Sequence, residues 1–566
     1  MIMTKNNIAL FAKGRDCRIA QSVRIPMRDG TELCATLYLP LQGCVFPSVL
    51  VRTAYNRTYG YDPYFTTHDM ALIVQDTRGR YDSEGTHNPF VNEAEDGADT
   101  IRWIAIQPWC NGQVGMYGPS YLAAVQFLAA PLCHGILKAA VPMFMAGDCW
   151  KHAYYCDGAF SLALTWSWLC FEVPGRISKA PQMTRLDVKK ILMSLPVADM
   201  DILTGAGRVP AFQDYVRRNR YGGHPWELLN VRARAADFQT PALLIGGWYD
   251  NYAAEAANTF LAFRRKAATQ SLRDSHRLLI GPWSHGFQGT SKLGEMDYGP
   301  DAIREDSAPQ RWLDTLLHDQ PPSAFMLKPV RLFVMGINQW RDEDDWPLPR
   351  TRYTPFYLGA GGRLDTHLPT AHQNPDLYIY DPADPVFTLG GNHSVGPYNP
   401  GLYDFCKPGA FDQRQLANRT DILSYVTDPL ASDTEVTGHV KLVLYASSSA
   451  PDTDFVARLI DVHPDGRAMN ITEGVIRARF REDLWGAPKL MDPGTVYAFT
   501  IDLQVTSNVF FKGHRIRLDV TSSNFPLWDR NLNTGHDPAT DTEMRKAKQT
   551  LHHDPNCPSH LMLPLA

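Results

Sequence analysis

Two kinds of hydrophobic pattern divide the chain. In its first part, short continuous apolar runs alternate with segments of helical spacing, and the helix predicted over residues 93–106 places Ala94, Ala98 and Ile101 on one face. The apolar runs are PSVLVRT, ALIVQDTRG, GQVGMYG and LKAAVP, and they follow the strand pair that we expect around the turn Arg28-Asp29-Gly30. Continuous apolar runs are typical of strands buried on both faces of a sheet. The alternation therefore predicts the α/β class, with a mainly parallel sheet and helices on both sides.

The strand pattern is interrupted after LKAAVP. About a hundred residues, rich in Trp, Phe and Met, separate it from the next apolar strand, TPALLIGGWYD. We interpret residues 145–236 as an inserted helical cap. The α/β pattern then resumes with PALLIGG, a helix over residues 253–265 and the strand HRLLIG, and we expect it to stop at Gly281.

Beyond about residue 325 the pattern changes to strict alternation with a period of two. Phe499, Ile501 and Leu503 alternate with small or polar residues, which is typical of a half-buried antiparallel sheet. Many such strands without intervening helices predict a β-sandwich or jelly roll. The expected domains are thus 1–144 and 237–324 for the α/β part, 145–236 for the cap and 325–566 for the β-domain.

Composition narrows the function classes. Lys and Arg total 55 against 60 for Asp and Glu, a net charge of -5 with both signs scattered, so nothing indicates nucleic acid or an anionic membrane as a partner. No apolar run approaches the roughly 20 residues that span a bilayer, and the first residues lack the apolar core of a signal peptide, so a cytoplasmic protein is expected. The 10 cysteines lack CxxC pairs or zinc-like spacing, which favours reduced thiols.

One serine stands where a strand pattern meets a helix pattern, in GQVGMYGPSYLAAVQFLAA. A serine at such a junction is the nucleophile-elbow arrangement, in which the hydroxyl lies above the strand ends. Gly118 precedes Ser120 as the G-x-S motif requires, but Leu122 replaces the second glycine of G-x-S-x-G. By itself this motif is weak, because a serine there is more often a helix N-cap.

A base and an acid follow in the chain order of α/β-hydrolases. Asp250 comes directly after the strand PALLIGG, and His285 lies just beyond the strand HRLLIG. Each follows the carboxyl end of a strand, where open α/β sheets place ligands. The alternatives are a helix N-cap for Asp250 and an ordinary loop position for His285. Their joint placement favours a catalytic triad of Ser120, Asp250 and His285.

Several motifs occur in an order seen in one known family: MRDGTELCATLYLP, DTRGRYDSEG, WCNGQVGMYGPSY, GGWYD and GPWSHG. The chain resembles the cocaine esterase and X-Pro dipeptidyl-peptidase (S15-like) serine hydrolases, which include α-amino acid ester hydrolases and glutaryl-cephalosporin acylases. The resemblance implies an α/β-hydrolase domain with an inserted helical cap and a C-terminal jelly-roll domain. It makes Ser120 the nucleophile, His285 the general base and acid, and Asp250 the residue that orients the imidazole. It also implies an oxyanion hole formed by the backbone N–H of Tyr121 and the hydroxyl of Tyr55.

Substrate preference is expected to come from the cap and from residues beside the triad. The aromatic candidates for the pocket are Trp150, Trp166, Trp168 and Tyr252, and the alternative is that they pack in the protein interior. In the family's α-amino acid ester hydrolases, acidic residues closely follow the catalytic aspartate. Here Asn251 and Tyr252 follow it, which favours neutral or aromatic acyl groups unless Asp148 or Asp157 supplies a charge.

The leading hypothesis is a serine hydrolase that cleaves a small-molecule carboxylic ester or amide through an acyl-enzyme. An X-Pro dipeptidyl or aminoacyl peptidase and an acyltransferase with the same triad are alternatives. A catalytically inactive carbohydrate- or partner-binding protein is the alternative of another class. No cofactor or metal is expected, because the adjacent His552 and His553 lack a third ligand at usable spacing. The resemblance suggests a homo-oligomer.

Overall fold

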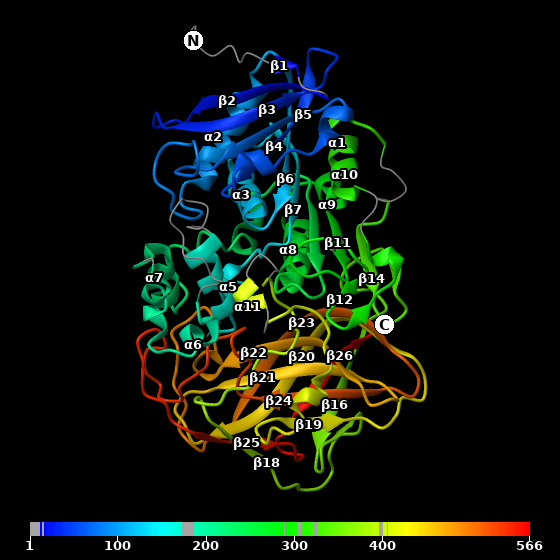
Figure 1. Cartoon of the computed structure of the whole chain (residues 1–566). Coiled ribbons are helices and arrows are strands. Elements are labelled where there is room, and N and C mark those ends of the chain that lie inside the picture. Colours follow the sequence, from blue (N-terminus) through cyan, green and yellow to red (C-terminus); the bar gives the residue numbers. More distant parts are fainter. Residues whose placement is uncertain are drawn as a thin grey trace.

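The computed structural model describes residues 12–13, 16–172, 186–205, 207–287, 289–303, 307–321, 327–395, 400–403 and 406–566. Figure 1 shows an α/β part in blue to green and a β-domain in yellow-green to red, with the cap helices beside the junction of the two. This arrangement confirms the predicted fold class, an α/β-hydrolase domain with a cap and a C-terminal β-domain.

The α/β part is built on one mixed sheet of eleven strands, ordered β1-β2-β3-β5-β4-β6-β7-β10-β11-β14-β15. Its centre, from β5 to β14, is parallel, whereas β1 to β3 and β15 pair antiparallel at the two edges. The strands are β1 (Ala12–Lys13), β2 (Arg18–Pro26), β3 (Glu32–Leu39), β4 (Phe46–Thr53), β5 (Ala71–Asp76), β6 (Cys110–Pro119), β7 (Leu137–Met143), β10 (Leu243–Gly247), β11 (Arg277–Gly281), β14 (Val330–Val334) and β15 (Gln339–Glu343).

The central strands are apolar on both faces because helices cover both faces. Leu50 of β4 packs in the same cluster as Ile101, whereas its neighbours Val49 and Val51 join the cluster of Leu313 on the opposite face. In Figure 1, α2 and α3 lie to the left of these strands and α10 to the right. The helices are α1 (Pro63–Thr67), α2 (Glu93–Ala105), α3 (Tyr121–Ala129), α8 (Ala253–Lys266), α9 (Gln270–Ser275) and α10 (Ala308–Leu317).

The expectation that the α/β pattern stops at Gly281 is wrong. Helix α10 follows, and β14 then pairs parallel with β11, with β15 returning antiparallel at the edge. The sequence pattern does not indicate the hairpin of β14 and β15, because β15 is an edge strand of mostly polar residues and has almost no apolar pattern. The division of the chain into domains stays a prediction, and its boundary between residues 324 and 325 lies outside the described residues.

The cap consists of short elements between β7 and β10. They are α4 (Cys149–His152), β8 (Tyr155–Cys156), β9 (Ala159–Phe160), α5 (Leu162–Ser167), a π-helical turn (Trp168–Glu172), α6 (Val188–Leu192) and α7 (Pro210–Arg217). The strands β8 and β9 form a small hairpin. Because the cap packs beside the carboxyl ends of the parallel strands, its side chains can reach the residues that follow those strands.

The β-domain is an almost entirely antiparallel sheet, ordered β18-β25-β20-β26-β16-β17-β19-β24-β21-β22, with β23 paired to β20. Along the first half of β23 the side chains of Phe499, Ile501 and Leu503 are buried between more exposed neighbours, which confirms the predicted period of two there, whereas the strand is buried on both faces beyond Leu503. Its strands are β16 (Arg352–Gly359), β17 (Arg363–Asp365), β18 (Asp376–Tyr380), β19 (Leu423–Val426), β20 (Thr434–Ser448), β21 (Asp454–Val462), β22 (Ala468–Arg477), β23 (Tyr497–Phe510), β24 (Arg515–Thr521), β25 (Ala547–His552) and β26 (His560–Leu565). The connecting segments add β12 (Lys292–Leu293), β13 (Met296–Asp297) and α11 (Pro400–Tyr403).

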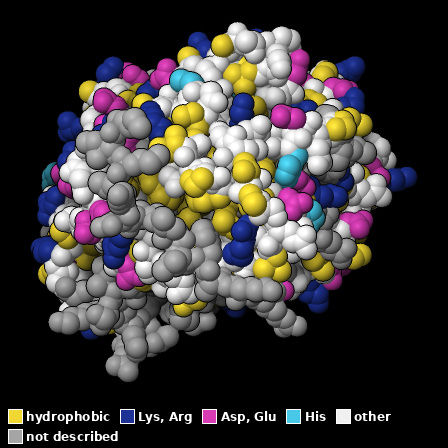
Figure 2. Space-filling view, turned by 90° about the horizontal axis from the view of Figure 1, so that it is seen from above, with side chains coloured by type: hydrophobic (Ala, Val, Ile, Leu, Met, Phe, Trp, Pro, Cys, Tyr) yellow, Lys and Arg dark blue, Asp and Glu magenta, His cyan; other side chains and the backbone are white. Residues whose placement is uncertain are grey.

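The surface carries both charge signs. In Figure 2, which views the α/β part from above, basic and acidic side chains are interspersed rather than gathered by sign. Among the described residues, no helix combines the length and the apolar character that crossing a membrane requires. All ten cysteines carry free thiols.

Candidate active site

Ser120 lies at the sharp turn between β6 and α3. Its backbone has φ 59° and ψ -122°, a conformation that is strained for a residue with a side chain, and its N–H donates to the Met143 carbonyl of β7 at 2.8 Å. Although Ser120 occupies the N-cap position of α3, its side chain makes no capping hydrogen bond. The hydroxyl of Ser120 therefore does not cap the helix, and the turn has the geometry of a nucleophile elbow.

Gly118 is required for this turn. Its φ is +145°, and a Cβ atom there would lie 2.5 Å from the Cβ atom of Leu122 on the first turn of α3. The strand and the helix thus approach too closely for a side chain at position 118. The motif keeps its first glycine for this reason and accommodates Leu122 in place of the second.

The three predicted triad residues come together. His285 Nε2 lies 2.9 Å from Ser120 Oγ, and His285 Nδ1 lies 3.1 Å from Asp250 Oδ2. Asp250 is completely buried, whereas the His285 side chain keeps 15% of its surface exposed. The N-cap of α8 is Tyr252, so Asp250 does not cap that helix. A buried carboxylate, an imidazole and a hydroxyl that are hydrogen-bonded in this order form the geometry that activates a serine.

Backbone contacts between two loops hold Asp250 and His285 in place. The N–H groups of Trp248 and Tyr249 donate to the carbonyls of Gly281 and Trp283, at 2.8 and 2.9 Å. A Cβ atom at Gly247 would lie 2.2 Å from the Trp283 carbonyl oxygen, so the loops can meet only because residue 247 is glycine. The GGWYD motif therefore positions Asp250 against the loop that carries His285.

The two predicted oxyanion-hole residues flank Ser120. Tyr121 is the first residue of α3, and such a backbone N–H has no acceptor within its own helix. The Tyr121 phenol is not one of the predicted oxyanion donors, because its hydroxyl donates a hydrogen bond of 2.6 Å to Glu93 Oε1. Burial raises the pKa of that phenol well above its usual value, which keeps it protonated. The Tyr55 hydroxyl oxygen accepts a hydrogen bond of 2.8 Å from Trp168 Nε1.

A cavity of about 270 Å³ opens beside Ser120. Its walls are rich in aromatic residues, and they combine residues from the α/β part, the cap and a loop of the β-domain that carries Ser394. The lining consists of Tyr55, Phe90, Pro119, Ser120, Tyr121, Met145, Tyr154, Leu164, Trp168, Glu172, Tyr252, His285, Gly286 and Ser394. Tyr252 lies edge-on to the His285 ring at 5.3 Å between centroids, so its predicted place beside the triad agrees with the structure.

Trp150 and Trp166 do not line this cavity, contrary to the pocket prediction. Both indoles are completely buried in the cap. Trp150 Nε1 donates to the Leu484 carbonyl at 3.0 Å, and Trp166 Nε1 donates to the Met200 carbonyl at 3.4 Å. Because each indole has its polar group satisfied by backbone within the interior, both serve packing. Trp168 is the cap tryptophan that reaches the cavity.

The cap carboxylates considered for a substrate charge are also occupied elsewhere. Asp148 caps α4, and Asp157 pairs with Lys151 at 2.8 Å. Glu255 is completely buried beside Arg232. Of the residues that line the cavity in the described part of the chain, Glu172 is the carboxylate.

A second, open depression meets the first at Ser120. It measures about 710 Å³ and is lined by residues that include Tyr55, Tyr59, Tyr81 and Leu122. The Tyr59 side chain is 84% exposed at its rim. Ser120 thus borders both the aromatic cavity and a more open depression.

Sequence reasoning missed Phe90, Met145, Tyr154, Leu164 and Ser394 as cavity residues. None belongs to a motif, and each comes from a different loop or short cap element. The proximity of Phe90 to Ser120 comes from its packing on the Tyr121 ring, with 4.6 Å between centroids. This kind of contact leaves no periodic signal in the sequence.

Comparison with known proteins agrees with this geometry. Residues 29–287 match the X-Pro dipeptidyl-peptidase (S15) family, and residues 324–562 match the X-Pro dipeptidyl-peptidase C-terminal non-catalytic domain. A cocaine esterase of Rhodococcus sp. (strain MB1 Bresler) is 38% identical over 589 aligned residues, covering 97% of this chain and 98% of the relative.

Solved structures give the same result. An α-amino acid ester hydrolase superposes with a TM-score of 0.83 at 26% identity, and an aminopeptidase from a marine sediment Thaumarchaeota archaeon does so with 0.82 at 25% identity. Each match covers 100% of this chain and 98% of the other. Fold and relatives together define the chain as a serine hydrolase with a C-terminal β-domain. It belongs to the cocaine esterase and X-Pro dipeptidyl-peptidase (S15) family.

Proposed function

We propose that the protein hydrolyses small carboxylic esters through a covalent acyl-enzyme on Ser120. The observation that carries this proposal is the continuous hydrogen-bonded series from Ser120 Oγ through His285 to the buried carboxylate of Asp250. A serine hydroxyl is a weak nucleophile by itself, and an adjacent base that removes its proton during attack is what activates it.

In the first half of the reaction, Ser120 Oγ attacks the ester carbonyl carbon while His285 Nε2 accepts the hydroxyl proton. Asp250 Oδ2 accepts a hydrogen bond from the Nδ1–H group of His285. This bond fixes the His285 tautomer that has a lone pair on Nε2, and it stabilises the imidazolium that forms. The tetrahedral intermediate then expels the alcohol, which takes the proton from His285. In the second half, His285 deprotonates water, which attacks the acyl-enzyme and releases the acid.

The Tyr121 backbone N–H and the Tyr55 hydroxyl are the proposed donors to the oxyanion. Since Trp168 donates to the Tyr55 oxygen, the phenol proton is directed to a different acceptor. Two donors that are fixed before the substrate arrives stabilise the negative charge of the intermediate without reorganisation.

The cavity supports an apolar or aromatic acyl group. Its walls carry the rings of Phe90, Tyr154, Trp168 and Tyr252, and its volume of about 270 Å³ suits an acyl group of modest size. The leaving alcohol then faces the wider opening at Tyr59 and Tyr81. The similarity to a cocaine esterase is consistent with an ester substrate of this kind.

An α-amino acyl ester or amide is the second candidate substrate. Glu172 lies in the cavity wall among aromatic rings, and a carboxylate with π-faces can receive an ammonium group. Two structural relatives carry the names α-amino acid ester hydrolase and aminopeptidase. Hydrolysis and transfer to another acceptor use the same acyl-enzyme, so an added alcohol also tests for acyl transfer.

Time-dependent labelling by a fluorophosphonate tests the nucleophile. We expect labelling of the purified protein at Ser120 and none in Ser120→Ala, followed by turnover of neutral aryl esters above that of aminoacyl esters and X-Pro amides. Preferred turnover of the aminoacyl substrates would instead support the second candidate. A folded wild-type protein that resists the label would overturn both and favour a binding function.

A further inference from the structure

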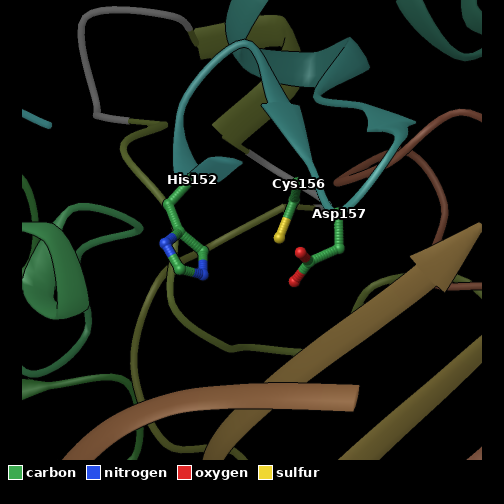
Figure 3. A group of neighbouring side chains, drawn as sticks. All are labelled: His152, Cys156 and Asp157. Atoms are coloured by element: carbon green, nitrogen blue, oxygen red, sulfur yellow. The ribbon is translucent and has the colours of Figure 1, made fainter. Parts of the chain in front are cut away.

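A second group of side chains that can bind or react lies outside the cavity beside Ser120, where the cap meets the β-domain. His152, Cys156 and Asp157 are buried, and each offers a ligand atom within 4.8 Å of the other two. Figure 3 shows the Cys156 sulfur and the Asp157 carboxylate pointing toward the His152 ring, with one ring nitrogen facing them and the other turned away. The three side chains thus surround one common space.

The orientation of His152 is that of a metal ligand. Its Nδ1 lies 3.1 Å from Glu255 Oε1, whereas its Nε2 makes no hydrogen bond within the described part of the chain. A histidine that bonds a carboxylate through one nitrogen keeps a lone pair on the other, and most metal-bound histidines are held in this way. A buried nitrogen without a hydrogen bond is otherwise costly.

Asp157 shows the same division between its two oxygens. Lys151 Nζ lies 2.8 Å from Oδ1, whereas Oδ2 is buried with no hydrogen-bond partner among the residues described. The ammonium thus holds the carboxylate from one side and leaves the other oxygen toward His152 and Cys156. Asp502 Oδ2 of β23 lies 3.7 Å from His152 Nε2 and 3.4 Å from Lys151 Nζ, so a carboxylate of the β-domain borders the cluster of three.

The surrounding ion pairs carry a surplus of negative charge. One connected network joins two fixed cations, Lys151 and Arg232, to His152 and four carboxylates. The carboxylates are those of Asp148, Asp157, Glu255 and Asp502. If the His152 imidazole is neutral, the network has a net charge of -2, from two cations and four carboxylates. Uncompensated charge in the protein interior has a high desolvation free energy. A divalent cation would balance it.

We propose that His152 Nε2, Cys156 Sγ and Asp157 Oδ2 form a structural site for a divalent metal ion of the zinc type, with Asp502 Oδ2 or a water molecule as the fourth ligand. Nitrogen, sulfur and oxygen ligands in a tetrahedral set suit Zn²⁺, whose bonds to such atoms are about 2.0 to 2.3 Å long. Binding displaces the Cys156 thiol proton to solvent and changes no oxidation state. The three ligands come from the cap, and Asp502 of the β-domain lies beside them, so the ion would stabilise the region where the cap meets the β-domain.

Cobalt(II) binding to the full-length protein, stripped with a chelator and dialysed, tests this site. A thiolate ligand gives Co²⁺ an intense near-ultraviolet charge-transfer band, and we expect that band at one equivalent of metal per chain. Cys156→Ser should abolish the band, whereas the matched control Cys149→Ser should keep it, because Cys149 is a buried thiol on the same segment that bonds the Ala146 carbonyl. His152→Gln, which retains the thiol, should weaken Co²⁺ binding at least about tenfold.

A wild-type protein that gives no thiolate band overturns the proposal, whatever the folding of the variants. So does a band that survives in folded Cys156→Ser, or an unchanged Co²⁺ affinity in folded His152→Gln. The cluster of Asp461, His463 and His514 is a second place where a metal could bind, but it contains no thiol and therefore gives no such band.

Discussion

Trp168 Nε1 donates a hydrogen bond of 2.8 Å to the hydroxyl oxygen of Tyr55, and this contact joins the cap to the active site. An indole N–H can only donate, so the Tyr55 oxygen is the acceptor, and the phenol keeps its own proton for another partner. Trp168 also begins the π-helical turn, an irregularity that is frequent at functional sites. The cap thereby orients the proposed oxyanion donor in addition to enclosing the cavity.

Removing this hydrogen bond should slow catalysis more than it weakens binding. Trp168→Phe keeps an aromatic wall but loses the donor, so we expect kcat to fall about tenfold with a small change in KM. Tyr55→Phe should lower kcat by about two to three orders of magnitude. Steady-state kinetics on an aryl ester measure both.

The double variant distinguishes positioning from a general packing defect. If Trp168 acts through Tyr55, then Trp168→Phe should cost little further activity in a Tyr55→Phe background. Trp166→Phe is the matched control, because its N–H bonds the Met200 carbonyl away from the cavity, and it should leave kcat nearly unchanged. Fully additive losses in the double variant contradict the positioning role.

Asp250→Asn should reduce kcat by about four orders of magnitude while the protein stays folded. The amide preserves the shape of the buried side chain but favours the wrong imidazole tautomer, with the proton on the nitrogen that faces Ser120. Burst-phase kinetics with a chromogenic ester measure the acylation step. Asp274→Asn, on the exposed helix α9, serves as control, and near-normal acylation in Asp250→Asn would exclude the triad.

Gly118→Ala should destabilise the protein by more than about 2 kcal/mol, because it combines an unfavourable φ with the 2.5 Å approach to Leu122 Cβ. Gly112→Ala separates the two effects. Position 112 has φ +88° but no heavy atom within 4 Å of the added Cβ, so that variant should cost only about 1 kcal/mol. Denaturant unfolding of both variants measures the difference, and equal losses would show that the close approach is unimportant.

Stability should fall as the solution becomes acidic. Burial lowers the pKa of His87 and His393 to about 4 and that of His276 to about 3. Below about pH 6.5 the unfolded chain therefore takes up protons that the native rings do not, so stability is lost as the pH falls from there toward 4. Each ring should contribute about 2 kcal/mol of loss at pH 5.

His276→Phe should reduce this pH dependence. Both of its ring nitrogens are buried without a hydrogen-bond partner in the described structure, and its ring packs 5.7 Å from that of Phe263, so a phenyl group can replace it. Thermal unfolding at pH 7 and pH 5 should show a smaller difference for His276→Phe than for the wild type. His134→Gln, at an exposed position, should show the wild-type difference, and an unchanged slope in His276→Phe would contradict the assignment.

Local sequence patterns determined the order of the parallel strands and the residues that follow their carboxyl ends. Strand period and strand ends placed Ser120, Asp250 and His285 beyond the carboxyl ends of parallel strands, and the structure brings their side chains within hydrogen-bonding distance. The glycines of these motifs are also explained by close approaches. A side chain at position 118 would meet Leu122 of helix α3, and one at position 247 would meet the backbone of Trp283. Parallel strands must align their ends, so the order of the strands implies the meeting of these residues.

Only the tertiary structure decided which aromatic residues line the cavity beside Ser120 and where the first sheet ends. Trp150, Trp166 and Trp168 look alike in sequence, but the packing of short cap helices buries the first two indoles and turns the third toward Tyr55. The polar edge strand β15 has no apolar signal of its own and is defined by pairing with β14. Such outcomes depend on contacts between segments far apart in the chain, and these contacts leave no period in the sequence.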